Sequence, residues 1–329
     1  MFRPDDNQST AGADSRAVCV WRFLDGRAGH RNQVLGLTEA LGRMVPIVCQ
    51  DIDVSQMLNG VRCLLPRPLN MLRRYRLPDF LIGAGHATHL PLLAAATWFG
   101  GKSIVLMKPS LPLALFDLCL VPAADGLRKI PPNVMLTEGA INRIRPGSAR
   151  IPDRGLVLIG GPSRHFGWSD SDVLRQVQSV IEASPAVEWT ISTSRRTPAT
   201  FLSAWQASGC RGRLVPVEQT NSEWLPAQLT TMANVWVTNE SVSMIFEALT
   251  AGAAVGILQL SPSRDSRVTR CVDSLISRKL VTPFNLFHVR LPAPIAGGLF
   301  NEAERCAEMI ARRYRIEIPD QELTRRRSA

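Results

Sequence analysis

The sequence alternates short apolar runs with segments of helical periodicity, and this alternation occurs in two successive series. The first series opens with AVCVWRFLDG (17–26) and HRNQVLGLTEALGRM (30–44), an apolar run, a glycine turn and an amphipathic segment. The second opens in the same way, with RGLVLIGGPS (154–163) and SDSDVLRQVQSVIEA (169–183). Strands that alternate with helices are typical of α/β folds with parallel sheets. The sequence therefore predicts an α/β protein of two Rossmann-like domains that face an inter-domain cleft.

The remaining elements follow the same rhythm. Further strands are expected at 45–52, 78–85, 102–109, 116–122, 187–194, 214–217, 234–240 and 253–260, and further helices at 197–206, 224–232, 241–252, 266–279 and 301–315. A polar segment with proline and glycine, RPGSARIPDR, separates the two series. We therefore expect a disordered leader (1–16), an N-terminal domain (17–148), a C-terminal domain (149–315) and a basic tail (316–329).

Composition restricts the class of protein. A chain of 329 residues, 45% apolar and 20% charged, can bury two cores. It contains no apolar run near the ~20 residues of a membrane span, and its polar N-terminus lacks the apolar core of a signal peptide. None of the seven cysteines forms a CxxC pair. Reduced thiols in a cytoplasmic protein are therefore expected, without disulfides or zinc.

The net charge of +10 comes mainly from 34 arginines, against four lysines. Such a balance attracts polyanions, but no nucleic-acid-binding signature accompanies it, so nucleic acid is not the expected partner. The segment MLNGVRCLLPRPLNMLRRYRL (57–77) mixes leucine and methionine with arginine. It suits either an anionic lipid surface or a helix with a solvated basic face.

The first glycine turn, LDGRAGHRNQ, carries two titratable residues between a strand and a helix. Gly26 and Gly29 permit a tight turn at the carboxyl end of a strand, where doubly wound sheets bind ligands. Asp25 or His30 could act as the general base for a hydroxyl nucleophile while the other orients it. An ordinary glycine turn with polar caps is the alternative.

The run LIGAGHATHLP (81–91) has a similar turn, with Gly85 followed by His86 and His89. No cysteine or carboxylate lies nearby to complete a metal site, so we expect no metal. A phosphate or sugar oxygen, or simple helix capping, fits the residues better. Gly85, His86 and Lys108 are therefore assigned, with Gly26 and Gly29, to an acceptor side.

Three stretches of the second series place hydroxyls, guanidinium groups and glycines after strands, which suits a phosphate. They are LIGGPSRHFGWS (158–169), STSRRTP (192–198) and VTNESVSMIFEALTAGAAVGI (237–257). The third also offers the free N–H groups of a helix start and a carboxylate suited to a ribose. The residues assigned to donor binding are Gly160, Gly161, Ser163, Arg164, Ser194, Arg195, Arg196, Asn239, Ser241, Ser243 and Glu247. Solvated loops and a surface glutamate are the alternatives.

Together with DGRAGHRNQ, VLMKPSLP and TEGAINR, these motifs resemble the Elm-type family over residues 20 to 315. The family is named for plant mitochondrial-fission proteins, and its bacterial members are classed as glycosyltransferases of lipo-oligosaccharide core assembly. The resemblance implies a GT-B-like fold in which Gly160, Gly161, Ser241, Ser243 and Glu247 match the donor-binding positions. The chain departs from the pattern at three places: Ala28 replaces proline, Glu240 replaces aspartate, and Ala-Ala follows Gly252.

The expected function is transfer of a sugar from a nucleotide-sugar to a glycolipid of the lipopolysaccharide-core type, at the cytoplasmic face of the inner membrane. No cofactor or metal is expected, because the pairs Asp51/Asp53 and Asp170/Asp172 are interpreted as structural. A nucleotide-sugar epimerase and a non-catalytic membrane adaptor in fission are the two alternatives.

Overall fold

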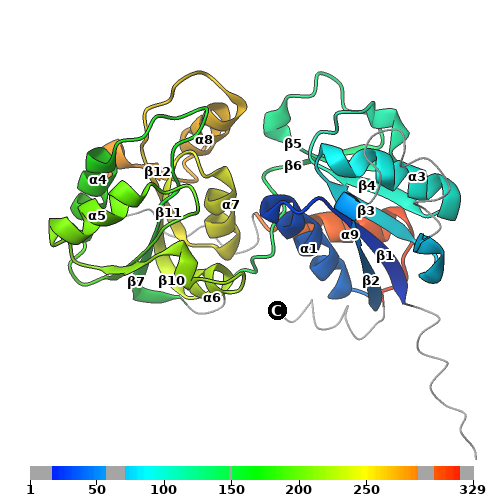
Figure 1. Cartoon of the computed structure of the whole chain (residues 1–329), viewed down its shortest axis with the longest axis horizontal. Helices are drawn as coiled ribbons and strands as arrows, with labels where there is room; N and C mark the ends of the chain where they lie inside the picture. The colour runs from blue at the N-terminus through cyan, green and yellow to red at the C-terminus, as the bar shows by residue number, and fades with distance from the viewer. Residues whose placement is uncertain (1–16, 57–70, 148–149, 288–299, 319–329) are drawn as a thin grey trace, which may run out of the picture. The chain divides into compact units, whose positions relative to one another are not determined.

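The computed structural model describes residues 17–56, 71–147, 150–287 and 300–318, and the chain forms two compact α/β units (Figure 1). The first unit comprises the chain up to Ala123, Leu127–Thr137 and the chain from Ala303 onward. The second comprises Ala124–Gly126 and Glu138–Glu302. Each unit is built around one parallel sheet of six strands. The expected α/β architecture of two Rossmann-like halves is confirmed.

The first sheet has the strand order β2-β1-β3-β4-β5-β6. Its strands are β1 (Val18–Leu24), β2 (Ile47–Asp53), β3 (Phe80–Ala84), β4 (Lys102–Leu106), β5 (Leu118–Pro122) and β6 (Val134–Thr137). Its helices are α1 (Ala28–Gly42), α3 (His89–Phe99) and α9 (Glu302–Arg313). The buried strand residues are almost continuous, as in β3, where all five are buried. Strands buried on both faces in this way are characteristic of parallel sheets.

The second sheet has the strand order β12-β11-β10-β7-β8-β9. Its strands are β7 (Ile151–Leu158), β8 (Glu188–Ser192), β9 (Arg213–Val215), β10 (Met232–Thr238), β11 (Ala254–Leu258) and β12 (Thr282–Pro283). Its helices are α4 (Asp170–Glu182), α5 (Ala199–Ser208), α6 (Trp224–Leu229), α7 (Val242–Ala251) and α8 (Arg267–Ser277). No helix in the described part of the chain is long and apolar enough to cross a bilayer.

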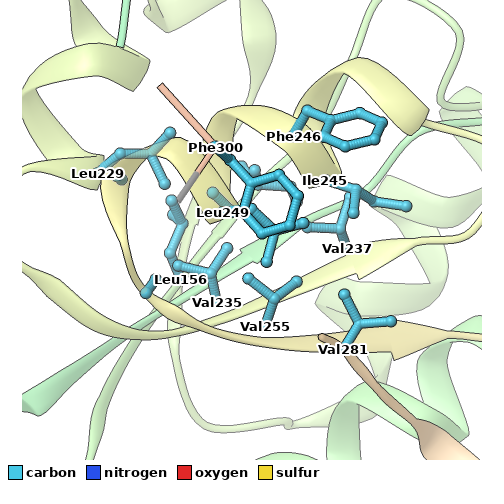
Figure 2. Packing of buried hydrophobic residues seen from close by; sticks show 14 of the residues in the cluster. Leu156, Leu229, Val235, Val237, Ile245, Phe246, Leu249, Val255, Val281 and Phe300 are labelled. Carbon is cyan, nitrogen blue, oxygen red and sulfur yellow. The ribbon is translucent and has the colours of Figure 1, made fainter. Parts of the chain in front are cut away.

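Alternate residues of the second sheet enter two different cores, because successive side chains of a strand point to opposite faces. Leu156 packs with Phe246, Leu249 and other buried residues around α7 (Figure 2). Leu158 belongs to the same core. Val157, which lies between them in sequence, packs with α4 and α5 on the other face. Helix α7 is therefore held against the sheet by its buried apolar side, which fixes the position of its N-terminus.

Helix α9 belongs to the first unit, whereas the sequence placed 301–315 in the C-terminal domain. Glu304 forms an ion pair with Arg43 of the first unit, with Oε2 and Nη2 2.7 Å apart. Arg305 donates a hydrogen bond to the carbonyl of Leu136, and Tyr314 packs edge-on against Phe80. The division between the units lies at Thr137/Glu138, not at 148/149. An amphipathic pattern predicts that one helix face is buried but does not identify the sheet that covers it.

Some sequence predictions lie outside the described residues. These are the leader 1–16, the end of the basic tail and most of the segment 57–77, of which only residues 71–77 are described. The six cysteines of the described residues are free thiols. Burial raises the pKa of Cys119 to about 12 and that of Cys271 to about 11. Both thiols are therefore poor nucleophiles at neutral pH.

Candidate functional site

Each sheet has one point where the strand order reverses, and the sequence-predicted residues gather there. In the first sheet β1 lies between β2 and β3, and in the second β7 lies between β10 and β8. Ligands of open α/β sheets bind outside the carboxyl ends of the strands at such a point. The turns of Asp25 and Gly85 follow β1 and β3, and those of Gly160 and Glu240 follow β7 and β10.

Asp25 and His30 form a hydrogen-bonded pair at the switch point of the first unit. The Nδ1 atom of His30 lies 2.7 Å from Oδ2 of Asp25, and Oδ1 of Asp25 accepts the backbone N–H of Arg27 at 3.1 Å. The Asp25 side chain is 4% exposed and that of His30 is 20% exposed. A carboxylate can only accept, so the proton of this bond belongs on Nδ1. The Nε2 atom of a neutral His30 is then an acceptor that can take a proton from a hydroxyl.

Gly85 provides the space for this pair. A β-carbon at residue 85 would overlap the His30 ring and would lie 2.9 Å from Oδ2 of Asp25. The residue has φ of +88°, a conformation that favours glycine. The glycine turns that follow β1 and β3 therefore meet at Asp25 and His30. The structure thus brings Asp25, His30 and Gly85 together.

The remaining acceptor-side residues lie around the same edge. Gly26, Gly29, His86 and Lys108 are exposed, whereas His89 is buried. Burial, and next the neighbouring His86 and His30, lower the pKa of His89 to about 4. His89 is therefore neutral at pH 7 and packs against the core.

The turn after β4 holds a strained residue that the sequence pattern did not indicate. Met107 has φ of +70°, which is uncommon for a residue with a side chain. Its sulfur lies 3.5 Å from Nε2 of Gln33, a residue of α1. Such outliers persist where the surrounding structure fixes them, and they gather at functional sites. Lys108 directly follows this residue.

Glu240 is the centre of the cluster in the second unit. Its Oε1 atom accepts hydrogen bonds from the backbone N–H of Gly161 at 3.0 Å, from Nη2 of Arg196 at 3.0 Å and from Oγ of Ser241 at 2.6 Å. Arg196 also donates to Oγ of Ser241 at 3.0 Å. A β-carbon at Gly160 would overlap the Glu240 carboxylate. The structure thus brings together four of the predicted donor-binding residues, Gly160, Gly161, Arg196 and Ser241.

The second oxygen of Glu240 is buried and has no hydrogen-bond partner among the described residues. Its side chain is 0% exposed. Leaving a buried polar atom unsatisfied costs on the order of 1–3 kcal/mol, and more for a charged group. Unsatisfied groups in native structures are therefore rare, and one at a strand end marks a place where a ligand can donate a hydrogen bond. Glu240 stands where the resemblance has aspartate, and it was not among the residues assigned to donor binding from the sequence.

A threonine that sequence reasoning also missed fixes the position of Arg196. Oγ1 of Thr197 donates to the carbonyl of Ile159 at 3.0 Å and accepts the N–H of Ser194 at 2.9 Å. The turn after β8 is therefore attached to the glycine turn after β7. Gly161 is needed at this contact, because a β-carbon there would overlap the backbone carbonyl of Arg196. Arg195, on the same turn, is exposed.

Other predicted donor-binding residues contact the protein itself. Oγ of Ser163 accepts the N–H groups of His165 and Phe166, both at 3.2 Å, so it shapes the loop after β7. Nε of Arg164 donates to Nε2 of His165 at 2.9 Å. The Nδ1 atom of His165 is buried without a partner in the described part of the chain. Its burial, and then Arg164, Arg264 and Arg267, lower the pKa of this histidine.

Three predicted residues surround the start of α7. Both side-chain atoms of the Asn239 amide bond to the backbone of Leu260 at 3.1 Å, so this residue fastens two loops together. Ser243 is exposed in the first turn, and Glu247 is buried at 8% exposure. Residues four positions apart lie on one helix face, so Ser243 and Glu247 share a side of α7. The N-terminus of α7 has no side-chain cap, which leaves its N–H groups available.

Acidic pairs with metal-like spacing have protein partners. Asp51 forms an ion pair with Arg22 at 2.5 Å, and Asp53 accepts the N–H of Ser55 at 2.9 Å. Asp170 accepts the indole N–H of Trp168 at 2.6 Å, and Asp172 lies in the first turn of α4. Within the described residues, no group of three or more His, Cys, Asp or Glu side chains is placed to hold a metal ion. These contacts favour the structural interpretation of the acidic pairs.

Two six-stranded parallel sheets, each with a glycine turn and a polar cluster at its switch point, define the class of GT-B-like α/β proteins. The family model described as "Mitochondrial fission ELM1" matches residues 28–314. The chain belongs to this family. No curated protein sequence matches the chain.

Solved structures share the fold at low identity. The S. aureus MnaA structure with UDP is 14% identical, with a TM-score of 0.54 over 92% of this chain and 99% of that chain. A crystal structure of UDP-N-acetylglucosamine 2-epimerase is also 14% identical, with a TM-score of 0.53 over 92% of this chain and 99% of the other. Likeness at this level establishes the two-unit fold.

Proposed function

We propose that the chain is a glycosyltransferase that moves a sugar from a nucleotide-sugar donor to a glycolipid acceptor of the lipopolysaccharide-core type. The observation that carries the proposal is the cluster around Glu240 at the switch point of the second sheet. It combines a Gly-Gly turn, a half-exposed guanidinium, an uncapped helix N-terminus and a buried carboxylate oxygen without a partner. The guanidinium and the helix N-terminus suit a diphosphate, and the carboxylate oxygen suits a hydroxyl or amide N–H of the donor. The N–H groups of Gly160 and Gly161 are bonded to Thr238 and Glu240, so these glycines contribute space for the ligand.

In this proposal the second unit binds the donor. The diphosphate lies at Gly160 and Gly161 and at the N-terminus of α7, where Arg196 balances its charge. The ribose hydroxyls donate to Glu247, which shares a helix face with Ser243. As the bond between the anomeric carbon and the phosphate oxygen breaks, the electron pair passes to the phosphate. Arg196 and the α7 dipole stabilise that charge.

The first unit supplies the base. The acceptor hydroxyl attacks the anomeric carbon, and its proton passes to Nε2 of His30. Asp25 holds the ring through Nδ1 and stabilises the imidazolium that forms, so both residues act as one general base. No metal is needed, because the protein's own cations stabilise the leaving group. The net charge of +10 suits an anionic membrane surface at the cytoplasmic face, where a lipid-linked acceptor would be found.

A nucleotide-sugar epimerase is the second candidate. The solved structures reported above are an epimerase and MnaA with UDP bound. A histidine held by a carboxylate can also remove a proton from carbon, which epimerisation requires. The two reactions share the donor site and differ in product, so product analysis separates them.

The first test is a calorimetric titration of the whole protein with UDP-, CMP-, GDP- and ADP-sugars. Saturable binding of at least one, lost in Glu247→Ala, supports an enzyme. Products are then analysed with and without a lipid-linked core acceptor. Transfer only in the presence of the acceptor supports the glycosyltransferase, and an epimerised donor in its absence supports the second candidate. If none of these nucleotide-sugars binds, the third alternative, a membrane adaptor in fission, would be favoured.

A further inference from the structure

The second unit contains a cavity at the edge of the sheet opposite to the Glu240 cluster. It lies at the amino ends of β7, β8 and β9, against the end of α4 and the loop after α5, and its volume is about 980 Å³. Small-molecule sites commonly have volumes of roughly 300–1,000 Å³. All of its lining residues belong to the second unit. The proposed donor site lies at the carboxyl ends of the strands, so this cavity has no part in it.

Three arginines line the cavity: Arg154, Arg211 and Arg213. They are exposed, and in the described part of the chain none of their guanidinium groups forms an ion pair or a side-chain hydrogen bond. Some other arginines of this unit, among them Arg143 and Arg196, have carboxylate partners. Unpaired guanidinium groups in a concave site are donors for an anion, and their fork geometry matches a phosphate.

The strand register directs these charges to one face. Arg154 is paired with Glu188 across β7 and β8, and Thr190 is paired with Arg213 across β8 and β9. Because Glu188 and Thr190 are two residues apart, their side chains lie on the same face of the sheet. Arg154 therefore lies beside Glu188, and Arg213 beside Thr190, on that face, two strands apart at a separation of roughly 10 Å between strand axes. Long arginine side chains can converge across this distance.

The cavity also offers acceptors and a buried donor. Glu182 and Glu188 line it, and they can accept hydrogen bonds from hydroxyl groups. Trp189, on the opposite face of β8, also lines it at 5% exposure, and its indole N–H is buried with no partner among the described residues. An anion without hydroxyl groups would be repelled by the two carboxylates and would form no hydrogen bond with them. A ligand with both an anionic group and several hydroxyls satisfies both kinds of side chain.

We propose that this cavity binds a small sugar phosphate, separately from the donor site. The phosphate contacts Arg154, Arg211 and Arg213, and the sugar hydroxyls donate to Glu188, which lies on the same face of the sheet as Arg154 and Arg213. The inference does not depend on the reaction proposed above, because no residue of the Glu240 cluster takes part in it.

The test is calorimetric titration of the whole protein with glucose 1-phosphate, inorganic phosphate and glucose. We expect saturable binding of glucose 1-phosphate that is at least tenfold weaker in Arg154→Gln/Arg213→Gln and unchanged in Arg175→Gln. Arg175 is the control, an exposed arginine of α4 that does not line the cavity. Glu188→Gln should weaken glucose 1-phosphate but not inorganic phosphate. A saturating nucleotide-sugar should leave the binding intact, which separates this site from the donor site.

Other results would overturn the proposal. They are the lack of saturable binding at millimolar glucose 1-phosphate, equal affinity in the double variant, and displacement by the nucleotide-sugar. If inorganic phosphate bound as tightly as glucose 1-phosphate, the sugar hydroxyls would contribute nothing to binding, which contradicts their proposed contact with a carboxylate. If the double variant does not fold, Arg211→Gln, which changes a loop residue, replaces it in the same titration.

Discussion

Arg196 and Glu240 form an ion pair of 3.0 Å in which the guanidinium is 45% exposed and the carboxylate side chain is 0% exposed. One partner of the pair is therefore in contact with solvent, and the other is buried at the end of β10. One carboxylate oxygen receives three donors, whereas the other is buried with none among the described residues. This uneven hydrogen bonding supports the proposed ligand site, because both oxygens would be satisfied in a purely structural ion pair.

Glu240→Gln is expected to lower both nucleotide-sugar affinity and stability. The amide keeps the size of the side chain, and its oxygen can still accept at the position of Oε1. The charge that pairs with Arg196 is lost and an amide N–H without a partner is buried at the position of Oε2, so the free energy of unfolding should fall by about 1–3 kcal/mol. Nucleotide-sugar affinity should fall at least tenfold, measured by calorimetry. Glu218→Gln, at an exposed glutamate, is the control, and unchanged affinity in Glu240→Gln would contradict a ligand-binding role.

Gly160→Ala is expected to distort the same cluster by steric overlap. The new β-carbon would meet the Glu240 carboxylate and would lie 2.6 Å from Oγ of Ser241. Overpacking of this kind costs about 1–3 kcal/mol in the free energy of unfolding. Urea denaturation measures it, with Gly167→Ala as a matched control, since the nearest atom to a β-carbon there is 3.8 Å away. Equal stability of the two variants would mean that the turn at Gly160 relaxes around the added methyl group without cost.

His30→Gln is expected to abolish transfer and to leave donor binding intact. Loss of a general base lowers the rate by a factor on the order of 10²–10⁴. Asp25→Asn should lower kcat as well, because the amide no longer selects the tautomer with Nδ1 protonated. Steady-state kinetics with a lipid-linked acceptor, alongside donor calorimetry, checks both variants. A His30→Gln enzyme with unchanged kcat would exclude this residue as the base.

His89 is expected to make the folded first unit less stable in acid. Its pKa is about 4 in the folded protein against about 6.5 in the unfolded chain, chiefly because it is buried. Between these values the unfolded state binds more protons, so stability is fully present above pH 6.5 and falls as the pH decreases towards 4. The loss is at most about 3 kcal/mol.

Urea denaturation between pH 7 and pH 4 measures this dependence. His89→Asn should flatten it, because no group at residue 89 titrates any longer. His86→Asn should retain most of it, since burial and not His86 is the main cause of the lowered pKa. An unchanged slope in His89→Asn would assign the acid sensitivity to other groups.

Much of the fold could be predicted from the sequence, because parallel strands are buried on both faces and appear as apolar runs. The runs that open each series correspond to β1 and β7. Helix α9 was placed in the wrong unit, since its partners Arg43 and Leu136 are distant in sequence. Local patterns carry no information about which sheet a terminal helix covers.

The candidate site was only partly accessible to sequence reasoning. Gly160, Arg196 and Ser241 could be grouped because the carboxyl ends of parallel strands meet at one edge. The central role of Glu240 could not be foreseen, because it depends on three donors from three separate turns. An acidic residue between a buried strand and the serine at the N-cap position of α7 was the available signal. Asn239 directly precedes Glu240 after the same strand, yet its amide is bonded to the backbone of Leu260 and not to the cluster.

The crystal structure of the protein with a bound nucleotide-sugar tests the central claim most directly. The account predicts the diphosphate at the Gly160–Gly161 turn and the N-terminus of α7, a ligand donor within hydrogen-bond distance of Oε2 of Glu240, and ribose hydroxyls at Glu247. A nucleotide-sugar bound elsewhere on the second unit, with Oε2 of Glu240 still without a partner, would contradict it.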